Sequence, residues 1–341
     1  FSNSSLRPHN TPTPVDPQGT IIFTRVRGLP LSQVGIIEGK SVSASLFDVA
    51  LVCYQLDLGK LRHSPCFYIP KTELAEEARW WSAVFKAIEV ERGWPRGTIK
   101  CMALVESHRL AHEMDPFIYG LRDHLIGLNL GRYDYLASFG DHLLNDQRYV
   151  LPDVPIPHDL PWFQALRPHV VETCHRRGIF AIGGMTARFP DKVDAELDAT
   201  AMEVLTRDKA NEAGKGFDGA WTGHPRQNEL ATRQFPFPNQ LDRRYLNEGK
   251  PDLRPVVGTS KITLEGSREA ARTAIRYFAR WLTGEGATLI DGHMEDRATF
   301  RIRLVMLAQR LRHGLISPEE LGRVFDEELA GLGSFMDLPP D

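Results

Sequence analysis

The most constraining feature of this 341-residue sequence is a pair of short apolar runs, each leading into a carboxylate. The stretch 99–105 is too short for a typical helix and apolar enough for a strand buried on both faces, and Glu106 follows it directly. The weaker run 126–130 leads to Asp134, after a helical pattern that is broken near Pro116. The acids are 28 residues apart (134 − 106), close to one βα unit of about 30 residues. The spacing therefore predicts successive parallel strands with a carboxylate beyond the end of each.

The same alternation of strand-like and helix-like segments continues along most of the chain. Strands are predicted at 19–26, 66–69, 99–105, 126–130, 179–184 and 217–222, and helices at 45–58, from 72 onward, at 162–176 and at 192–213. Repeated alternation of this kind is typical of a parallel α/β barrel, which takes about 250 residues. The predicted fold class is therefore α/β, a TIM (β/α)8 barrel that forms the catalytic domain over residues 20–264.

The pattern changes after an irregular stretch at 223–262, and only helices are predicted beyond it. Ser267 is expected to cap a helix whose inward side chains are Ala271, Ala274, Ile275, Phe278 and Trp281. Another helix is predicted at about 295–312, and a capping box at Ser317, followed by Pro318, opens the last one. Residues 265–341 are thus predicted to form an all-helical C-terminal plug, and the Ser- and Pro-rich residues 1–19 a mobile lead-in.

Composition argues against two kinds of partner. The chain is 42% hydrophobic and 25% charged with a net charge of −3, so it carries no basic footprint for nucleic acid. It has no run of 18 apolar residues, so no membrane partner is predicted. Cys53, Cys66 and Cys101 lie in apolar runs and are expected to be reduced core residues, which favours a cytoplasmic protein. The oligomeric state stays open.

The ends of the chain bear on its location. It starts at Phe1 without an initiator Met or a signal peptide, and we expect it to begin part-way through a longer polypeptide. The end, Pro339-Pro340-Asp341, is not a peroxisomal tripeptide. A peroxisomal location is nevertheless left open, because targeting information at the natural termini would be missing from this sequence.

Glu106 and Asp134 are the first candidate site residues. In a parallel barrel both would lie at the mouth where active sites are found, and two carboxylates there suit a hard ion such as Mg²⁺. The simpler interpretation is a pair of polar residues at strand ends. His108 and His112, four residues apart, offer a zinc alternative, but no Glu follows the first His as in the usual zinc motif. Gly131 would let the backbone approach an anionic ligand closely.

Two further charged residues occupy positions with both a plain and a catalytic interpretation. Arg25 ends the first predicted strand, where a surface ion pair is the usual role and stabilisation of an oxyanion at a barrel mouth is the alternative. Asp296 precedes a predicted helix, where a carboxylate is favoured by the helix dipole alone. From the residues alone, the helix-terminus role is the better interpretation of Asp296.

Taken together, a series of ordered segments resembles the malate synthase family, in particular its shorter A-type branch, from about residue 20 to about 331. The segments are Arg25-Val26-Arg27-Gly28, Ser45-Leu46-Phe47-Asp48, Phe67-Tyr68-Ile69-Pro70-Lys71, Pro95-Arg96-Gly97-Thr98-Ile99-Lys100, Glu106, Leu121-Arg122-Asp123-His124, Gly131-Arg132-Tyr133-Asp134-Tyr135, Thr173-Cys174-His175-Arg176-Arg177-Gly178, Gly183-Gly184-Met185, Asp218-Gly219, Trp221, His224-Pro225 and Met294-Glu295-Asp296 with Ala298-Thr299. So many matches in order are specific for the family.

The resemblance implies a TIM barrel capped by a helical plug. It also implies an acyltransferase of the EC 2.3.3 type, which condenses acetyl-CoA with glyoxylate and hydrolyses the malyl thioester to malate and CoA in the glyoxylate bypass. By this resemblance Arg25 matches the catalytic arginine, and Asp296, delivered by the plug, matches the catalytic base. These roles agree with the chemistry, because removing an α-proton from a thioester needs a positioned base and a partner for the enolate charge.

The resemblance also implies a metal and an acceptor site. Glu106 and Asp134 match the Mg²⁺ ligands, and the ion would act as Lewis acid and template for glyoxylate. The backbone after Gly131, through Arg132, Tyr133 and Asp134, would hold the glyoxylate carboxylate. Further candidate site residues in the matching segments are Lys71, Met185 and Glu295.

The sequence also departs from the family pattern. The family usually carries an acidic pair in a Phe-Glu-Asp-Ser segment, and if Phe1-Ser2-Asn3-Ser4 corresponds to it, Ser2 and Asn3 replace both acids. The run 290–293 before the expected base also differs from the usual type. Two alternatives follow: a related Claisen-type synthase or lyase that uses another 2-oxo acid or acyl-CoA, and a catalytically silent barrel that acts as a binding module.

Overall fold

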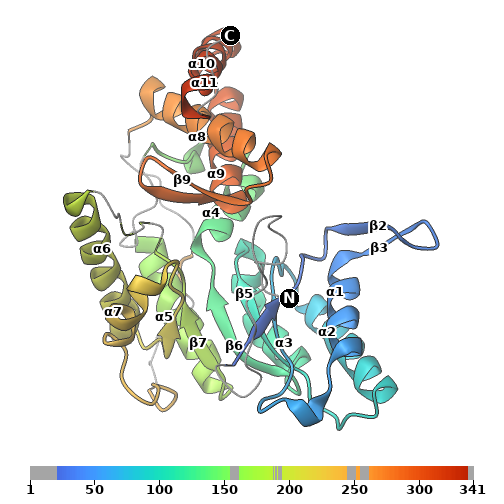
Figure 1. Ribbon diagram of the computed structural model, residues 1–341. Helices are drawn as coiled ribbons and strands as arrows, with labels where there is room; N and C mark the ends of the chain where they lie inside the picture. Colours follow the sequence, from blue (N-terminus) through green and yellow to red (C-terminus); the bar gives the residue numbers. More distant parts are fainter. Residues whose placement is uncertain are drawn as a thin grey trace. The chain divides into compact units, whose positions relative to one another are not determined.

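The computed structural model describes residues 21–153, 161–186, 188, 190, 194–243, 251–253 and 261–336 (Figure 1). The chain divides into two compact units. The first comprises Phe1–Leu130, Val170–Ile182 and Leu241–Arg244, and the second comprises Gly131–His169, Gly183–Gln240 and Tyr245–Asp341. The predicted lead-in at 1–19 lies outside the described residues.

Parallel strands form the centre of the first unit. In spatial order they are β1 (Phe23–Arg25), β4 (Cys66–Ile69), β5 (Lys100–Val105), β6 (Leu125–Leu130) and β7 (Phe180–Gly183), the last ending at the start of the second unit. All of β4 and nearly all of β5 are buried, as expected for continuous apolar runs in a sheet covered on both faces. The predicted α/β class and the order of these strands are confirmed.

Helices follow these strands in the order predicted. They are α1 (Ala44–Gln55), η2 (Leu58–Lys60), α2 (Ala75–Glu91) and α3 (His108–Gly120), and α2 and α3 pack against each other (Figure 1). The helix α2 is followed by Gly93 with φ +63°, which only glycine adopts readily. The predicted break near Pro116 is wrong, because α3 continues through it with Phe117 and Ile118 buried beyond. Tertiary packing here outweighs the loss of one helical hydrogen bond.

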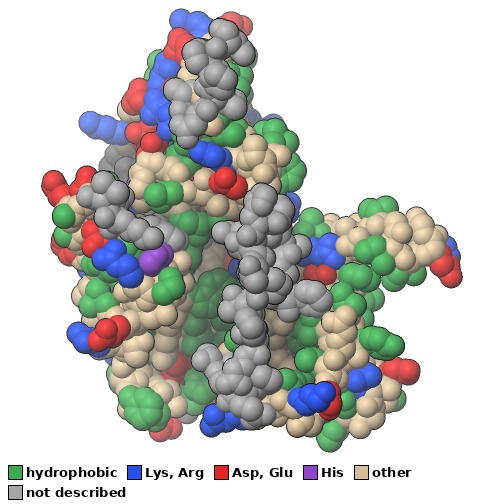
Figure 2. Space-filling view, viewed as in Figure 1, with side chains coloured by type: hydrophobic (Ala, Val, Ile, Leu, Met, Phe, Trp, Pro, Cys, Tyr) green, Lys and Arg blue, Asp and Glu red, His purple; other side chains and the backbone are tan. Residues whose placement is uncertain are grey.

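The sequence analysis missed an antiparallel hairpin in the first unit. Strands β2 (Ser32–Ile37) and β3 (Lys40–Ser43) pair with each other and carry mostly exposed side chains. Figure 2 shows hydrophobic side chains on the surface of this hairpin, where Val34 and Ile36 are both exposed. A strand without a buried face has no alternating apolar pattern, so the periodicity did not reveal it.

The second unit contains the remaining elements. They are α4 (Arg132–His142), η3 (Gln147–Tyr149), the first half of α5 (Pro161–Arg176), α6 (Ala195–Gly214), β8 (Gly219–Ala220), η4 (Pro225–Gln227), α7 (Asn228–Thr232), α8 (Leu264–Leu282), β9 (Ala287–Ile290), β10 (His293–Asp296), α9 (Arg297–Arg312), α10 (Pro318–Ala330) and α11 (Leu332–Phe335). The amide N–H of Trp221, after β8, donates to the carbonyl of Gly183 at 3.2 Å and thereby joins β8 to the end of β7.

The C-terminal part is helical, as predicted, with three corrections. Its helices α8 and α9 are separated by the β9–β10 hairpin, so the prediction of helices only was wrong. The cap of α8 is Thr263, and Ser267 lies within the helix. Phe278 and Trp281 are 47% and 52% exposed and do not point inward as expected. They stack on each other with ring centroids 5.6 Å apart.

Helices α4 and α9 pack closely within the second unit. A Cβ placed on Gly140 of α4 would lie 2.4 Å from Cγ1 of Val305, so the contact requires glycine. Gln309 of α9 accepts a hydrogen bond from the amide of Leu151 at 2.9 Å and donates to the carbonyl of Tyr149 at 3.1 Å. These contacts fix α9 against α4 and the segment that follows α4.

Candidate active site

The exits of β5 and β6 are neighbours in the first unit. The register of the two parallel strands pairs Val105 with Leu130, the last residue of each. Glu106 follows β5 directly and is buried. The chain leaves β6 into Gly131 and the helix that carries Asp134, which is also buried. The prediction that these two acids follow neighbouring parallel strands is confirmed.

Lys71, at the exit of β4, contacts Glu106. Its backbone N–H donates to Oε1 of Glu106, and its Nζ lies 3.9 Å from Oε2. Lys71 adopts φ +60°, a left-handed conformation that is costly for a residue with a side chain. The next residue, Thr72, is buried and donates its hydroxyl to the carbonyl of Leu104 at 2.6 Å, which anchors the strained turn to β5. Backbone strain of this kind is concentrated at functional sites.

Arg25 ends β1 in the same unit. It is exposed and pairs in register with Tyr68 of β4. Arg25, Lys71 and Glu106 thus belong to the exits of β1, β4 and β5, three consecutive strands of the sheet. Active sites of α/β barrels are built from residues at this end of the strands.

The helix α4 begins without a side-chain cap. Its N-cap residue is Gly131, with φ −98° and ψ 83°, and its first turn comprises Arg132, Tyr133 and Asp134. The first amide N–H groups of a helix have no partner inside the helix and carry the positive end of the helix dipole. A helix start of this kind suits an anionic group such as a carboxylate.

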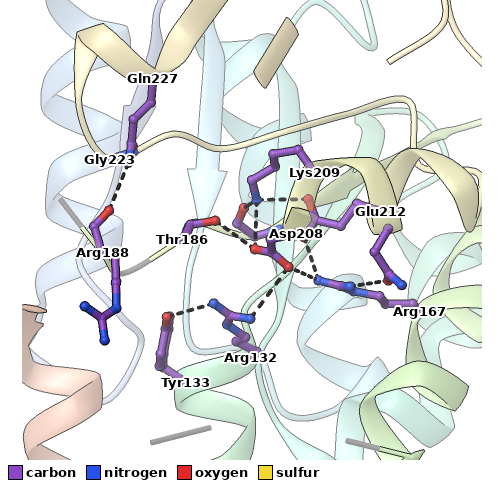
Figure 3. A network of polar contacts seen from close by, with 12 residues as sticks. Arg132, Tyr133, Arg167, Thr186, Arg188, Asp208, Lys209, Glu212, Gly223 and Gln227 are labelled. Atoms are coloured by element: carbon purple, nitrogen blue, oxygen red, sulfur yellow. Dashed lines mark hydrogen bonds and ion pairs between the residues drawn. The ribbon is translucent and has the colours of Figure 1, made fainter. Parts of the chain in front are cut away.

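The side chain of Arg132 points into a buried charged network (Figure 3). Its Nη2 donates to the Tyr133 hydroxyl at 3.0 Å, and its Nη1 lies 3.8 Å from Oδ1 of Asp208 on α6. Asp208 also accepts from Arg167 of α5 at 2.6 Å and from the hydroxyl of Thr186 at 2.8 Å. The sequence analysis assigned Arg132 to the acceptor site and did not identify Asp208 or Arg167.

Two more buried charges complete the network. Nζ of Lys209 lies 2.9 Å from Oε2 of Glu212, and Oε1 of Glu212 accepts from the amide of Gly184 at 3.1 Å. Lys209 also donates to the carbonyl of Gly184. Burial would raise the pKa of Asp208, but Arg132, Lys209 and Arg167 outweigh it and hold that pKa below its usual range. Burial raises the pKa of Glu212.

The glycines after β7 are explained by this network. A Cβ on Gly183 would lie 2.2 to 2.7 Å from the carboxylate atoms of Glu212, so only glycine leaves room for that side chain. Gly183 has no positive φ, so it is close packing and not backbone conformation that requires glycine there. Met185, another candidate residue, is half-buried in the same loop.

Asp296 joins the hairpin to α9. The β9–β10 turn is formed by Asp291 and Gly292, with φ +48° and +76°. Oδ1 of Asp296 accepts from the amides of Ala298 at 2.8 Å and Thr299 at 3.2 Å, and the Thr299 hydroxyl accepts from the Asp296 amide. The helix-terminus interpretation of Asp296 is therefore confirmed, and Oδ2 takes no part in this capping box.

Glu295 lies beside Asp296 on β10. It is only 5% exposed, and among the residues that the structure describes its Oε2 has no hydrogen-bond partner. The preceding part of β10 is connected to the loop after β7 by a bridge between His293 and Arg188. The carbonyl of Arg188 accepts in turn from Nε2 of Gln227 at 3.0 Å.

The candidate residues thus fall into separate groups. The first unit holds Arg25, Lys71 and Glu106, and the second holds Gly131, Arg132, Tyr133, Asp134, Met185, Glu295 and Asp296. Contacts join Lys71 to Glu106, and Arg132 to Tyr133. Convergence of Glu106, Asp134 and Asp296 on one site stays a prediction.

The His108–His112 pair and the possibility of a membrane-spanning helix can be checked in the described parts of the chain. The rings of His108 and His112 are in contact, 4.9 Å apart, but no group of three or more His, Cys, Asp or Glu residues able to hold a metal occurs among the described residues. Across the same ranges, no helix has the length and apolar character needed to cross a membrane.

Comparison with known families first defines the class. Residues 21–250 match the family model for the malate synthase TIM barrel domain, and residues 261–332 match the model for the malate synthase C-terminal domain. The protein is therefore an α/β protein with a TIM-barrel domain and a helical C-terminal part. It belongs to the malate synthase family.

Individual relatives agree with this assignment. Malate synthase of Myxococcus xanthus (strain DK1622) is 38% identical over 310 residues, which cover 88% of this chain and 57% of the relative. Malate synthase A of Escherichia coli (strain K12) is 36% identical over 309 residues, covering 87% of this chain and 58% of the relative. The chain spans a little over half the length of these curated relatives.

A solved structure shares the fold. A malate synthase of Haloferax volcanii, in a ternary complex with pyruvate and acetyl-CoA, has a TM-score of 0.60 and 16% sequence identity. The match covers 93% of this chain and 80% of that chain.

Proposed function

We propose that this protein condenses acetyl-CoA with glyoxylate and hydrolyses the resulting thioester to malate and CoA. The observation that carries the proposal is the register of β5 and β6, which sets the exits leading to Glu106 and Asp134 next to each other. Membership of the malate synthase family and the names of the relatives support the same reaction. Acetyl-CoA and glyoxylate are therefore the proposed substrates, and the glyoxylate bypass the proposed context.

Magnesium is the proposed cofactor. Glu106 and Asp134 offer carboxylate oxygens, the donors that Mg²⁺ prefers, and the ion commonly takes only one or two protein carboxylates and completes its shell with substrate and water. Both carboxylates are buried, so a divalent cation would also balance their charge. When bound, the ion would supply Lewis-acid polarisation of the acceptor carbonyl.

The acceptor would bind at the start of α4. The glyoxylate carboxylate is an anion, and the first-turn amides after Gly131 meet no capping side chain. Hydrogen bonds from Arg132, Tyr133 and Asp134 backbone N–H groups would orient the aldehyde carbon for attack. Binding through the backbone leaves the Arg132 side chain in its contacts with Tyr133 and Asp208.

Asp296 would remove a proton from the methyl group of acetyl-CoA. Its Oδ1 is held by two helix amides, so Oδ2 is the oxygen positioned to accept that proton. Arg25 would stabilise the negative charge that develops on the thioester oxygen. The enolate carbon then bonds to the aldehyde carbon of glyoxylate, the new alkoxide takes a proton, and water cleaves the thioester to release CoA as a thiol.

The proposed organisation places the barrel at residues 20–264 and the base-bearing domain at 265–341. A cytoplasmic location is proposed from the cysteines, because Cys53, Cys66, Cys101 and Cys174 are all free and buried.

Thiol release tests the proposal. The protein is mixed with acetyl-CoA, glyoxylate and Mg²⁺, and free CoA is followed with a thiol reagent, with omission of glyoxylate as the control. We expect CoA to be released only when glyoxylate is present, and a chelator of divalent cations to abolish this release. A panel of other 2-oxo acids and a malyl-CoA cleavage assay detect a synthase or lyase of altered specificity. Calorimetric binding of glyoxylate without turnover would instead indicate a binding module.

A further inference from the structure

The buried charges of α6 are unusual for a helix that only covers a sheet. Asp208, Lys209 and Glu212 are all at most 1% exposed, and Arg167 of α5 is fully buried against them. Burying charged groups is costly even when they are paired, and apolar residues of similar size often give equal or greater stability. A gain in stability alone therefore does not account for so many buried charges in one place.

The carboxylate of Asp208 contacts two segments of the second unit that are far apart in the sequence. Its Oδ1 lies 3.8 Å from Nη1 of Arg132, the first residue of α4, and accepts from Arg167 at 2.6 Å. Its Oδ2 accepts from the hydroxyl of Thr186 at 2.8 Å, in the loop after β7 (Figure 3). One side chain thus connects the start of α4 to that loop.

Glu212 and Lys209 hold the same loop through its backbone. Glu212 accepts from the amide of Gly184, and Lys209 donates to its carbonyl. The absence of a side chain at Gly183 admits the Glu212 carboxylate. Both backbone groups of Gly184 and the side chain of Thr186 are therefore held by α6, so the loop has little freedom to shift without α6.

The network also carries an excess of positive charge. Arg132, Arg167 and Lys209 supply three cations, whereas Asp208 and Glu212 supply at most two negative charges. Charge of this sign, buried next to the first turn of α4, favours an anion at that helix start.

We propose that Asp208 is a positioning residue that couples the first turn of α4 to the Gly184–Thr186 loop and so sets the affinity for the anionic acceptor. Thr186 is its contact in the loop and Arg132 its contact on α4. The inference rests on the proposed function for the identity of the acceptor, whereas the coupling itself concerns only the contacts of Asp208.

The test compares Thr186→Val, which removes the hydroxyl with little change in shape, with Thr186→Ser, which keeps it. Backbone amide exchange at residues 131–135 is followed by mass spectrometry, together with the Kd and KM for glyoxylate. For Thr186→Val, the exchange rate in this turn is expected to rise about tenfold. The Kd and KM for glyoxylate should also rise about tenfold, because one hydrogen bond to a charged group is lost. The kcat should stay within about twofold of the wild type. Thr186→Ser is expected to stay within about twofold of the wild type throughout.

Asp208→Asn is a second variant, which keeps the size of the side chain and removes its charge. Its effect on the 131–135 exchange should exceed that of Thr186→Val, because Arg132 then loses its ionic partner. Asp198 lies on the same helix as Asp208 and forms an exposed ion pair with Arg226 of η4. Asp198→Asn is therefore the matched control and should leave exchange in residues 131–135 unchanged.

The outcomes separate the two proposals. Unchanged exchange at 131–135 in both Thr186→Val and Asp208→Asn overturns the coupling, whether or not the protein is active. A general loss of thermal stability with wild-type KM would assign the network a purely structural role and also overturns it. If the wild type neither binds nor consumes glyoxylate, the proposed function fails, while the exchange data still decide the coupling.

Discussion

Two helices of the second unit begin in opposite ways. The helix α9 starts at Asp296, whose carboxylate accepts two first-turn amides and whose own amide is bound by Thr299. The helix α4 starts at Gly131, which has no side chain to offer. Both starts have the same electrostatics, since every helix N-terminus carries unsatisfied N–H groups and a partial positive charge. They differ in the N-cap residue, which accepts first-turn amides through its side chain at α9 and has no side chain at α4, where Asp134 is the acidic residue of the first turn.

The two helix starts therefore have different proposed roles. At α9 the anion is permanent and is the proposed base, so one carboxylate both stabilises a helix and is aligned by it. At α4 the N-cap glycine gives a weaker helix start, and the proposed acceptor anion would take the place of a cap. A third start, at α10, provides a reference without a proposed catalytic role, because Ser317 and Glu320 form a capping box there.

The largest effect is expected from separating the two roles of Asp296. Asn caps a helix about as well as Asp, but its amide cannot act as a general base. Asp296→Asn should therefore lower kcat about 10³-fold with little change in stability. Asp296→Ala should show the same loss of activity and in addition cost about 1 kcal/mol of unfolding free energy. Thiol release, deuterium exchange into the acetyl-CoA methyl group, and chemical denaturation measure the three quantities. Retained methyl exchange in Asp296→Asn would remove Asp296 from the role of base.

A smaller effect is expected from giving α4 a cap of its own. In Gly131→Ser the hydroxyl should accept a hydrogen bond from the amide of Tyr133 or Asp134 and so compete with the glyoxylate carboxylate. The Kd for glyoxylate should rise about tenfold, because glyoxylate would lose about one charge-assisted hydrogen bond. Gly131→Ala adds the same carbon without an acceptor and is the control. Calorimetry with glyoxylate distinguishes them, and equal Kd values for the Ser and Ala variants would mean that capping competition plays no part.

At α10 the effect should be on stability alone. Ser317→Ala removes the cap that accepts the Glu320 amide at 3.1 Å and should lower the free energy of unfolding by about 1 kcal/mol. Ser317→Asp keeps an acceptor and should restore it. Activity is expected to match the wild type in both variants. A loss of activity in Ser317→Ala would show that helix starts in this part cannot be separated into stabilising and catalytic ones.

The smallest effect is a pH dependence at the same capping box. The amide of Ser317 donates to Oε2 of Glu320 at 3.0 Å and lowers the pKa of that carboxyl from its ordinary value of 4.5. A lowered pKa in the folded state means that the stabilisation is complete above pH 4.5 and is lost as the pH falls through the lower folded value. The difference in Tm between the wild type and Glu320→Gln should therefore be present at pH 7 and shrink below pH 4.5. A difference that grows on acidification would contradict this sign.

The sheet was predictable because its strands follow a pattern that local sequence carries. The runs leading to Val105 and Leu130 are continuous and apolar, and a strand buried on both faces requires nothing more. The β9–β10 hairpin was missed although Asp291-Gly292 is a strong turn signal. The prediction of helices only rested on the helical spacing on both sides of this dipeptide and did not use the turn signal.

The charged network was beyond what one sequence reveals. Asp208, Lys209 and Glu212 lie on a helix rich in charges, which on its own indicates a solvated surface. Their partners Arg132 and Arg167 lie on other helices, and only the folded chain brings them together. The role of Gly183 was hidden for the same reason, since the side chain that requires it is Glu212. Which residues far apart in the sequence come into contact depends on the topology of the fold, and hydrophobic periodicity carries no information about it.

The close approach of α4 and α9 at Gly140 has a consequence for inherited variation. A methyl group there would collide with Val305, so the two helices could not keep their spacing if this position carried any other amino acid. Gly140 is not among the candidate site residues, yet it limits how closely α4 and α9, the helices that begin after Gly131 and Asp296, can pack. A substitution of Gly140 would thus retain every candidate site residue and still alter the spacing of these two helices, an effect that a search confined to the candidate residues would not predict.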